Sequence, residues 1–281
     1  MIYVSTGGFK NQNFNDAVNE LSNAGIVAFE LTGGKHSDNS LERLTALGKK
    51  YALALHNYFP PPKIPFVLNL ASFQDDIVQS TINHITNAID LSNSIGAKFY
   101  SFHAGYLIDP LVNELGDKII NQELNDRQRA LDYFIDRASS LAEYAENKGV
   151  KLLVENNVLS RINYESFDDN PLLMVEATET HEIIDRSHPN LGLLVDVAHL
   201  KISANTLSFS ENEYLDRFYD NVDAYHLSDN LGLEDTNNEI TISSWFWPHI
   251  RKDAEYYSVE VYNKSPKFLK TQVELIESML I

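Results

Sequence analysis

Four ionisable residues of this sequence lie at the ends of apolar runs, and together they have the composition of a metal-binding site. Glu155 ends the run LLVE, Asp196 ends LLVD, His226 ends AYH and Glu260 lies within SVEV. Three carboxylates and one imidazole suit manganese, magnesium, cobalt or zinc, because such ions accept mainly oxygen ligands together with some nitrogen. Without a cation, three carboxylates brought together would repel one another and become partly protonated. The four residues therefore predict a site for one divalent ion.

The spacing of these residues indicates the fold that must position them. The intervals between them, 41, 30 and 34 residues, are each close to the length of one strand followed by one helix. Eight β-rich runs alternate with longer amphipathic stretches, which is typical of a parallel sheet built from βα units. A closed barrel of eight units usually has roughly 250 residues, and this chain has 281. The expected strands are residues 2–5, 28–31, 52–56, 98–103, 151–155, 192–196, 224–227 and 257–261.

The sequence thus predicts one α/β domain over residues 1–281, a single (β/α)8 TIM barrel. An open doubly wound sheet would usually carry a glycine-rich turn after its first strand, and the pair Gly7-Gly8 does not have that pattern. Long loops are expected at residues 60–73, 106–125 and 160–170, at the end of the barrel where active sites lie. Helices are expected at residues 15–24, 40–50, 75–95, 126–148, 171–186 and 267–279.

Further ionisable residues fall at the same end of the predicted barrel. Glu30, His56 and His103 end other expected strands, and His199 lies one helical turn beyond Asp196. Each alone has a structural alternative, because a carboxylate at a strand end is often a helix cap and a buried histidine is often part of the core. Because all of them fall at the same end of the predicted strands, one shared site is favoured. We expect Glu30, His56 and His103 to contact the substrate in this site. For His199, a second metal ion, a substrate contact and a helix cap are all left open.

The composition excludes several classes of function. Acidic residues outnumber basic ones by 40 to 22, which gives a net charge of −18, and no lysine- or arginine-rich run offers a nucleic-acid surface. The sequence has no cysteine, so thiolate metal sites and cysteine nucleophiles are excluded. No segment approaches ~18 consecutive apolar residues, and the first residues lack the pattern of a secretory signal. We expect a cytoplasmic protein that binds a small molecule and neither nucleic acid nor membrane; a homo-oligomer is left open.

The segments around these residues resemble the xylose-isomerase-like TIM barrel superfamily over essentially the whole chain. The resemblance is closest to the branch of sugar phosphate isomerases and epimerases, which is related to the class II apurinic endonucleases. It rests on FHAGY at His103, LLVEN at Glu155, LLVDVAH at Asp196 and His199, YHLSDN at His226 and Asp229, and VEVY at Glu260.

The resemblance implies a metal-dependent isomerase of carbohydrate metabolism. In the sugar-acting members, the residues that match Glu155, Asp196, His226 and Glu260 bind one divalent ion, commonly manganese, and the two glutamates serve as acid and base. We therefore expect Mn²⁺, with Zn²⁺, Mg²⁺ and Co²⁺ as alternatives, and an enediolate intermediate formed from a small sugar, ketose or sugar phosphate. Proton return from the opposite face would give epimerisation, and return to the neighbouring carbon would give isomerisation. By the same resemblance, His199 and Asp229 are expected among the substrate contacts.

This sequence departs from the family pattern in the loop that follows His226. Residues 231–240 read LGLEDTNNEI, without the glycine-rich segment with a histidine and a proline and without the arginine found in some epimerases. The apurinic endonucleases need a further histidine there, and none occurs between His226 and His249. These departures leave the substrate open. They also leave three alternatives: dehydration of a polyol ketone at the same site, phosphodiester cleavage, and a non-catalytic sugar-binding barrel.

Overall fold

Eight parallel strands form a closed barrel in the computed structural model, which describes residues 1–37, 40–115, 117–120 and 122–281. The strands pair in sequence order, and the eighth pairs with the first to close the barrel. They are β1 (Ile2–Ser5), β2 (Ala28–Thr32), β3 (Ala52–His56), β4 (Phe99–His103), β5 (Lys151–Glu155), β6 (Leu191–Asp196), β7 (Val222–Leu227) and β8 (Tyr256–Val259). The predicted (β/α)8 TIM barrel is confirmed, with a strand at each expected position.

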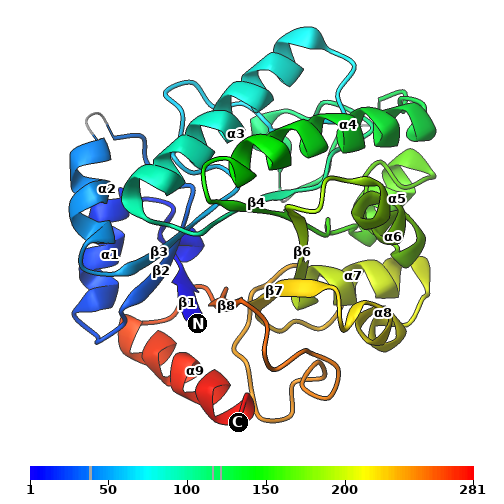
Figure 1. Cartoon of the computed structure of the whole chain (residues 1–281). Coiled ribbons are helices and arrows are strands. Elements are labelled where there is room, and N and C mark those ends of the chain that lie inside the picture. Colours follow the sequence, from blue (N-terminus) through cyan, green and yellow to red (C-terminus); the bar gives the residue numbers. More distant parts are fainter. Residues whose placement is uncertain (38–39, 116, 121) are drawn as a thin grey trace.

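Helices surround the barrel on its outside (Figure 1). They are α1 (Phe14–Ser22), α2 (Ser40–Gly48), α3 (Asp75–Ile95), α4 (Arg127–Glu146), α5 (Arg161–Phe167), α6 (Ala177–Arg186), α7 (Val197–Leu207), α8 (Glu211–Phe218) and α9 (Pro266–Met279), with the 3-10 helices η1 (Gly7–Phe9) and η2 (Val112–Glu114). The last helix, α9, packs against β1 and α1, so the final βα unit lies beside the first. No helix in the described part of the chain is long and apolar enough to cross a membrane.

One predicted helix is shorter than expected. The helix expected at residues 171–186 begins only at Ala177. The preceding residues are held away from helical geometry, because the N–H of Leu173 donates to the carbonyl oxygen of Gly105 at 3.0 Å and Met174 has a left-handed φ of 57°. Pairing with the loop after β4 therefore overrides the helical spacing of the apolar residues in this segment.

Two other boundaries also differ from the sequence prediction. The loop expected at residues 160–170 contains helix α5, whose N-terminus is capped by the side chain of Ser160, which accepts from the N–H of Asn163. The last strand ends at Val259, so Glu260 is the first residue of the following loop. Its N–H still donates to β7, to the carbonyl oxygen of Leu227 at 3.0 Å. Glu260 is thus held in line with the strand although it lies just beyond it.

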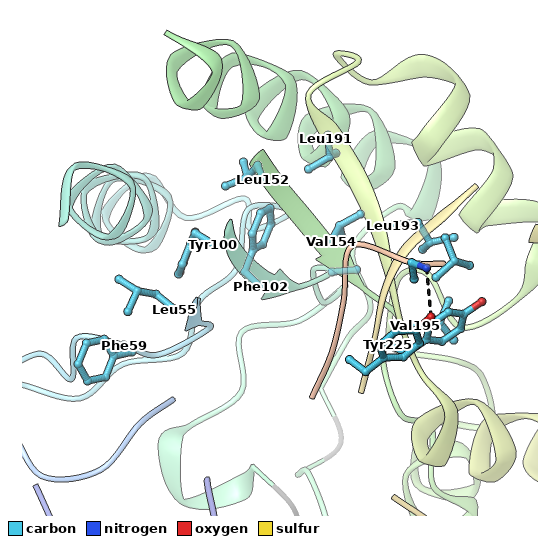
Figure 2. Packing of buried hydrophobic residues seen from close by; sticks show 14 of the residues in the cluster. Leu55, Phe59, Tyr100, Phe102, Leu152, Val154, Leu191, Leu193, Val195 and Tyr225 are labelled. Atoms are coloured by element: carbon cyan, nitrogen blue, oxygen red, sulfur yellow. Dashed lines mark hydrogen bonds between the residues drawn. The ribbon is translucent and has the colours of Figure 1, made fainter. Parts of the chain in front are cut away.

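The side chains of each strand alternate between the outside and the interior of the barrel. Outward residues pack beneath the helices, as Figure 2 shows for Leu152, Val154 and Leu193. The lower interior is filled by the apolar side chains of Tyr3, Ala28, Ala54, Phe99, Leu153, Leu194, Ala224 and Tyr256. Two residues beyond five of these, on the same inner face, come Glu30, His56, Glu155, Asp196 and His226. The alternation that fills the barrel therefore also places the ionisable residues at its C-terminal mouth.

Removal of a large side chain from the outer core tests this packing. We expect Leu152→Ala to lower the free energy of unfolding by about 2–5 kcal/mol, because Leu152 is fully buried between β5 and the helices. The control is Leu231→Ala, since the same side chain is 86% exposed there and the change should stay within about 0.5 kcal/mol. Urea unfolding followed by circular dichroism measures both. Equal losses in the two variants would contradict the packing described here.

Candidate metal centre

Four buried side chains meet at the barrel mouth around the imidazole of His226. Its Nδ1 lies 3.4 Å from Oε1 of Glu155, 3.7 Å from Oε2 of Glu260 and 3.9 Å from Oδ2 of Asp196. A metal ion bound at about 2.0–2.2 Å by such ligands holds neighbouring donor atoms roughly 3–3.5 Å apart. The structure therefore places a carboxylate oxygen of each of the other three predicted ligands within 4 Å of His226 Nδ1, and two of these distances are somewhat longer than one ion requires.

Several donor atoms in this cluster have no hydrogen-bond partner. Both oxygens of Glu155, Oδ2 of Asp196 and Nδ1 of His226 are buried and unpartnered. Buried polar atoms in folded proteins are almost always hydrogen-bonded, because an unpaired one costs free energy. A divalent cation would supply the missing partner for all three residues at once. The residues thus fit the metal ion that their chemistry implies.

Asp196 is held in place by its other oxygen. Oδ1 accepts hydrogen bonds from the N–H groups of Ala198 at 2.7 Å and His199 at 2.8 Å, so the side chain caps the N-terminus of α7. The side chain of Asn156 bonds to both backbone groups of Asp196. This strand-end aspartate is therefore a helix cap through one oxygen. Its second oxygen is left pointing into the cluster.

Glu30 lies against the opposite edge of the His226 ring. Its Oε2 is 3.0 Å from Nε2 of His226, and its Oε1 accepts a 2.8 Å hydrogen bond from Ser258. Burial alone would lower the pKa of His226, but Glu30, Glu260 and Glu155 outweigh it and raise that pKa well above its usual value. When a metal ion displaces the proton on Nδ1, the neutral imidazole still donates from Nε2 to the carboxylate, which orients the ring for metal binding. Glu30 thus contacts the candidate ligand His226 through Nε2, on the ring edge away from Nδ1.

Three further histidines surround the carboxylate of Glu155. His56 Nε2 and His103 Nδ1 lie 3.5 and 3.7 Å from Glu155 Oε2, and His199 Nδ1 lies 3.3 Å from Oε1. His103 is the most open of the three, since 23% of its side chain is exposed. Glu155 is thus shared between neighbouring groups of ligands. Among the described residues, three groups have donor atoms close enough to hold a metal ion: His56–Glu155–His226, His103–Glu155–His199 and Glu30–His226–Glu260. None of them contains Asp196 or joins Glu155 with Glu260, so the four-residue ligand set stays a prediction.

The loop between β7 and β8 contributes a residue that sequence analysis did not identify. Asp235 Oδ2 lies 3.4 Å from Nε2 of His199. Asp235 ends no strand, so the strand phase that located the other residues contained no signal for it. Asp229, for which a substrate contact stays a prediction, lies at the base of this loop, where it accepts a 2.8 Å hydrogen bond from Lys201 and pairs through its backbone with Asn238.

The two glutamates expected to act as acid and base have pKa values shifted in opposite directions. Burial raises the pKa of Glu260 to about 8, assisted by the charges of Asp196 and Glu155 and opposed by His226. Burial would also raise the pKa of Glu155, but His103 and the other histidines outweigh it and hold that pKa well below its usual value. Two neighbouring carboxyl groups whose pKa values are shifted apart in this way can provide an ionised base and a protonated acid. A bound cation would lower the pKa of both carboxyl groups.

Comparison with known proteins identifies the family. Residues 18–249 match the family described as Xylose isomerase-like TIM barrel. The chain belongs to this family. The resemblance recognised in the strand-end motifs is thereby confirmed, and the family's barrel agrees with the observed fold. No match was found among curated proteins.

Solved structures extend the likeness over the whole barrel. A D-tagatose 3-epimerase-like protein is 19% identical, with a TM-score of 0.70 and coverage of 100% of this chain and 99% of its own. The D-psicose 3-epimerase of Clostridium cellulolyticum H10, solved with D-tagatose, is 12% identical, with a TM-score of 0.68 and 99% of each chain covered. The IOLI protein, solved with a zinc atom, is 13% identical, with a TM-score of 0.66 and coverage of 99% and 95%. Distant structural relatives thus include sugar epimerases, and at these identities the likeness establishes the fold.

Replacement of Glu30 tests the arrangement around His226. We expect Glu30→Gln to weaken Mn²⁺ or Zn²⁺ binding by about 10–100-fold, because a neutral amide holds the Nε2–H of His226 less strongly than a carboxylate. Competition with a chromogenic chelator measures the affinity. The control is Glu274→Gln, which removes the same charge from an exposed position on α9. Unchanged affinity in Glu30→Gln would mean that His226 does not depend on Glu30 for metal binding.

Proposed function

We propose that this protein is a metal-dependent epimerase or isomerase of a small sugar or ketose. The observation that carries the proposal is the set of buried, unpartnered donor atoms on Glu155, Asp196 and His226 at the mouth of a barrel of this family. In the proposal these residues and Glu260 hold one divalent ion, for which we suggest Mn²⁺, with the zinc seen in a structural relative as the alternative. His56, His103, His199 and Asp229 are proposed to serve the substrate, and Glu30 to orient His226.

The reaction would use the two glutamates on opposite sides of one carbon. When bound, the ion acts as a Lewis acid on the adjacent carbonyl and hydroxyl oxygens of the substrate. In this proposal Glu155 is ionised and takes the proton from the carbon beside the carbonyl. Glu260 carries a proton, which it returns to the other face of the planar, deprotonated substrate, and so inverts the centre. Return of the proton to the neighbouring carbon by one carboxylate would instead produce isomerisation.

Tyr262 is proposed to hold Glu260 in position for this step. Its hydroxyl donates to Oε1 of Glu260 at 3.3 Å, while Oε2 faces His226. The ring lies against the turn after β1, where a Cβ atom added to Gly7 would lie 2.1 Å from the Tyr262 hydroxyl oxygen. A side chain at Gly7 would therefore displace the hydroxyl, and this glycine leaves the space that Tyr262 needs. The glycine pair after the first strand thus has a packing role at the site.

Phosphodiester cleavage is the second candidate function. It is favoured by the group His103–Glu155–His199, which could hold a further metal ion and to which Asp235 adds a carboxylate. A net charge of −18 opposes it, since a nucleic acid would be repelled by most of the surface. Incubation of the metal-loaded protein with a duplex that contains an abasic site distinguishes the two functions, because only the second predicts strand cleavage.

Metal removal and replacement test the leading function. The protein purified from manganese-supplemented medium should contain stoichiometric divalent ion by elemental analysis, and it should exchange the substrate hydrogen beside the carbonyl in heavy water. Chelation should abolish the exchange and added Mn²⁺ should restore it. We expect Glu155→Gln to lose both properties, because it removes the charge of a proposed metal ligand whose oxygens accept no hydrogen bond, and Glu274→Gln to keep both. Full metal content in Glu155→Gln would contradict the proposed ligand set.

The role of Tyr262 can be separated from general damage to the site. Tyr262→Phe should slow the proton transfer that depends on Glu260 by about tenfold, the value of one hydrogen bond, with metal content unchanged. Exchange from the epimer whose hydrogen faces Glu155 should persist, so the two epimers should become unequal in their exchange rates. Tyr144→Phe, which removes a surface hydroxyl bonded to Asp90, is the matched control. Equal slowing of both epimers would assign Tyr262 a merely structural role.

A further inference from the structure

The barrel interior beside the candidate metal centre contains a buried row of polar contacts. The hydroxyl of Tyr256, on β8, donates to Oγ of Ser101, on β4, at 3.4 Å. Oγ of Ser101 lies in turn 2.9 Å from Nδ1 of His56, on β3. All three residues are buried, and His56, the most open of them, is 4% exposed. Because water is excluded here, each polar hydrogen needs a partner within the protein.

Tyr256 is the hydrogen-bond donor at the start of this row. Burial, assisted by the charge of Glu30, raises the pKa of the Tyr256 hydroxyl well above its usual value, so the proton stays on the oxygen. Glu30 is a second acceptor near this hydroxyl. Its two oxygens, however, already face Nε2 of His226 at 3.0 Å and the hydroxyl of Ser258 at 2.8 Å. The proton of Tyr256 is therefore directed to Ser101.

The hydroxyl of Ser101 passes this direction on to His56. A serine hydroxyl accepts through its lone pairs and has one proton to donate. Since Oγ of Ser101 accepts from Tyr256, its own proton is left for Nδ1 of His56. A neutral imidazole that accepts a hydrogen bond at Nδ1 carries its proton on Nε2. Nε2 of His56 lies 3.5 Å from Oε2 of Glu155, so the row of contacts directs an N–H toward this carboxylate.

We infer that Tyr256 and Ser101 are positioning residues that hold His56 in the tautomer with its proton on Nε2. In this tautomer the nitrogen that faces Glu155 has no free lone pair, so His56 does not bind the metal ion through it. The group His56–Glu155–His226 is then not the metal site, although its donor atoms are close enough. The inference rests on the proposed function, because it assigns His56 a role as a hydrogen-bond donor in the same site.

NMR of the histidine ring nitrogens measures this tautomer directly. The full chain, with nitrogen-labelled histidine, is studied without metal and with Zn²⁺, and His56→Gln identifies the signals of His56. We expect one tautomer, protonated at Nε2, in both states. Ser101→Ala should raise the share of the other tautomer by about tenfold, the value of one hydrogen bond. A proton on Nδ1 in the unsubstituted chain, or loss of the Nε2 proton when Zn²⁺ is added, would overturn the inference.

Two buried hydroxyl groups elsewhere in the fold provide matched controls. Ser92→Ala removes a buried hydroxyl on α3 that has no hydrogen-bond partner in the described structure, and Tyr214→Phe removes one that bonds between α8 and α6. Neither should change the signals of His56, whereas Tyr256→Phe should shift the tautomer in the same direction as Ser101→Ala. Equal shifts in all four variants would show that general loss of packing is the cause, and would overturn the positioning role.

Metal analysis tests the consequence for the ligand set. After dialysis, His56→Gln should keep stoichiometric Zn²⁺, and His226→Gln should lose it. Loss of Zn²⁺ from His56→Gln, with an unchanged circular dichroism spectrum, would make His56 a ligand and overturn the inference. Absence of substrate hydrogen exchange from the unsubstituted chain would overturn the proposed function alone, because the tautomer of His56 is measured without substrate.

Discussion

Mutual repulsion among the buried carboxylates of Glu155, Asp196 and Glu260 is the constraint around which the mouth of this barrel is built. The N–H groups of the surrounding strands donate to carbonyl groups of neighbouring strands, so they donate no hydrogen bonds to these carboxylate oxygens. Histidines stand between the carboxylates and offset part of the charge. The atoms that remain without a hydrogen-bond partner are oxygen and nitrogen atoms that could coordinate a divalent ion. Such an ion binds the folded chain only, so it would also stabilise the fold.

Most of this arrangement could be read from the sequence because a parallel barrel imposes one direction on all its strands. Every strand ends at the same mouth, and side chains two residues apart share a face. An ionisable residue in phase with an apolar run is therefore placed by its own strand, as Glu155 and Asp196 are. The family motifs reinforced this reading, and the family match confirms the resemblance.

The remainder could not be predicted because it depends on contacts between distant loops. Asp235 reaches His199 only because the loop after β7 folds back on itself. Phase places Glu30 at the mouth, but it does not show that its carboxylate lies against the far edge of the His226 ring. The late start of α6 has the same origin, since a hydrogen bond from Leu173 to the loop after β4 competes with helical propensity. The alternation of apolar residues in the sequence thus predicts where a residue lies along its strand. The contacts of its side chain depend on the tertiary structure.

The contact of Tyr262 with the turn at Gly7 joins the two ends of the barrel at the site itself. During synthesis the first strand leaves the ribosome long before β8, and it has no partner on that side until β8 pairs with it. Glu260 and its tyrosine lie in this last segment. A nascent chain that contains only the first seven strands includes Glu155, Asp196 and His226 but lacks Glu260. The fourth carboxylate can therefore join the other three residues only after β8 has been synthesised.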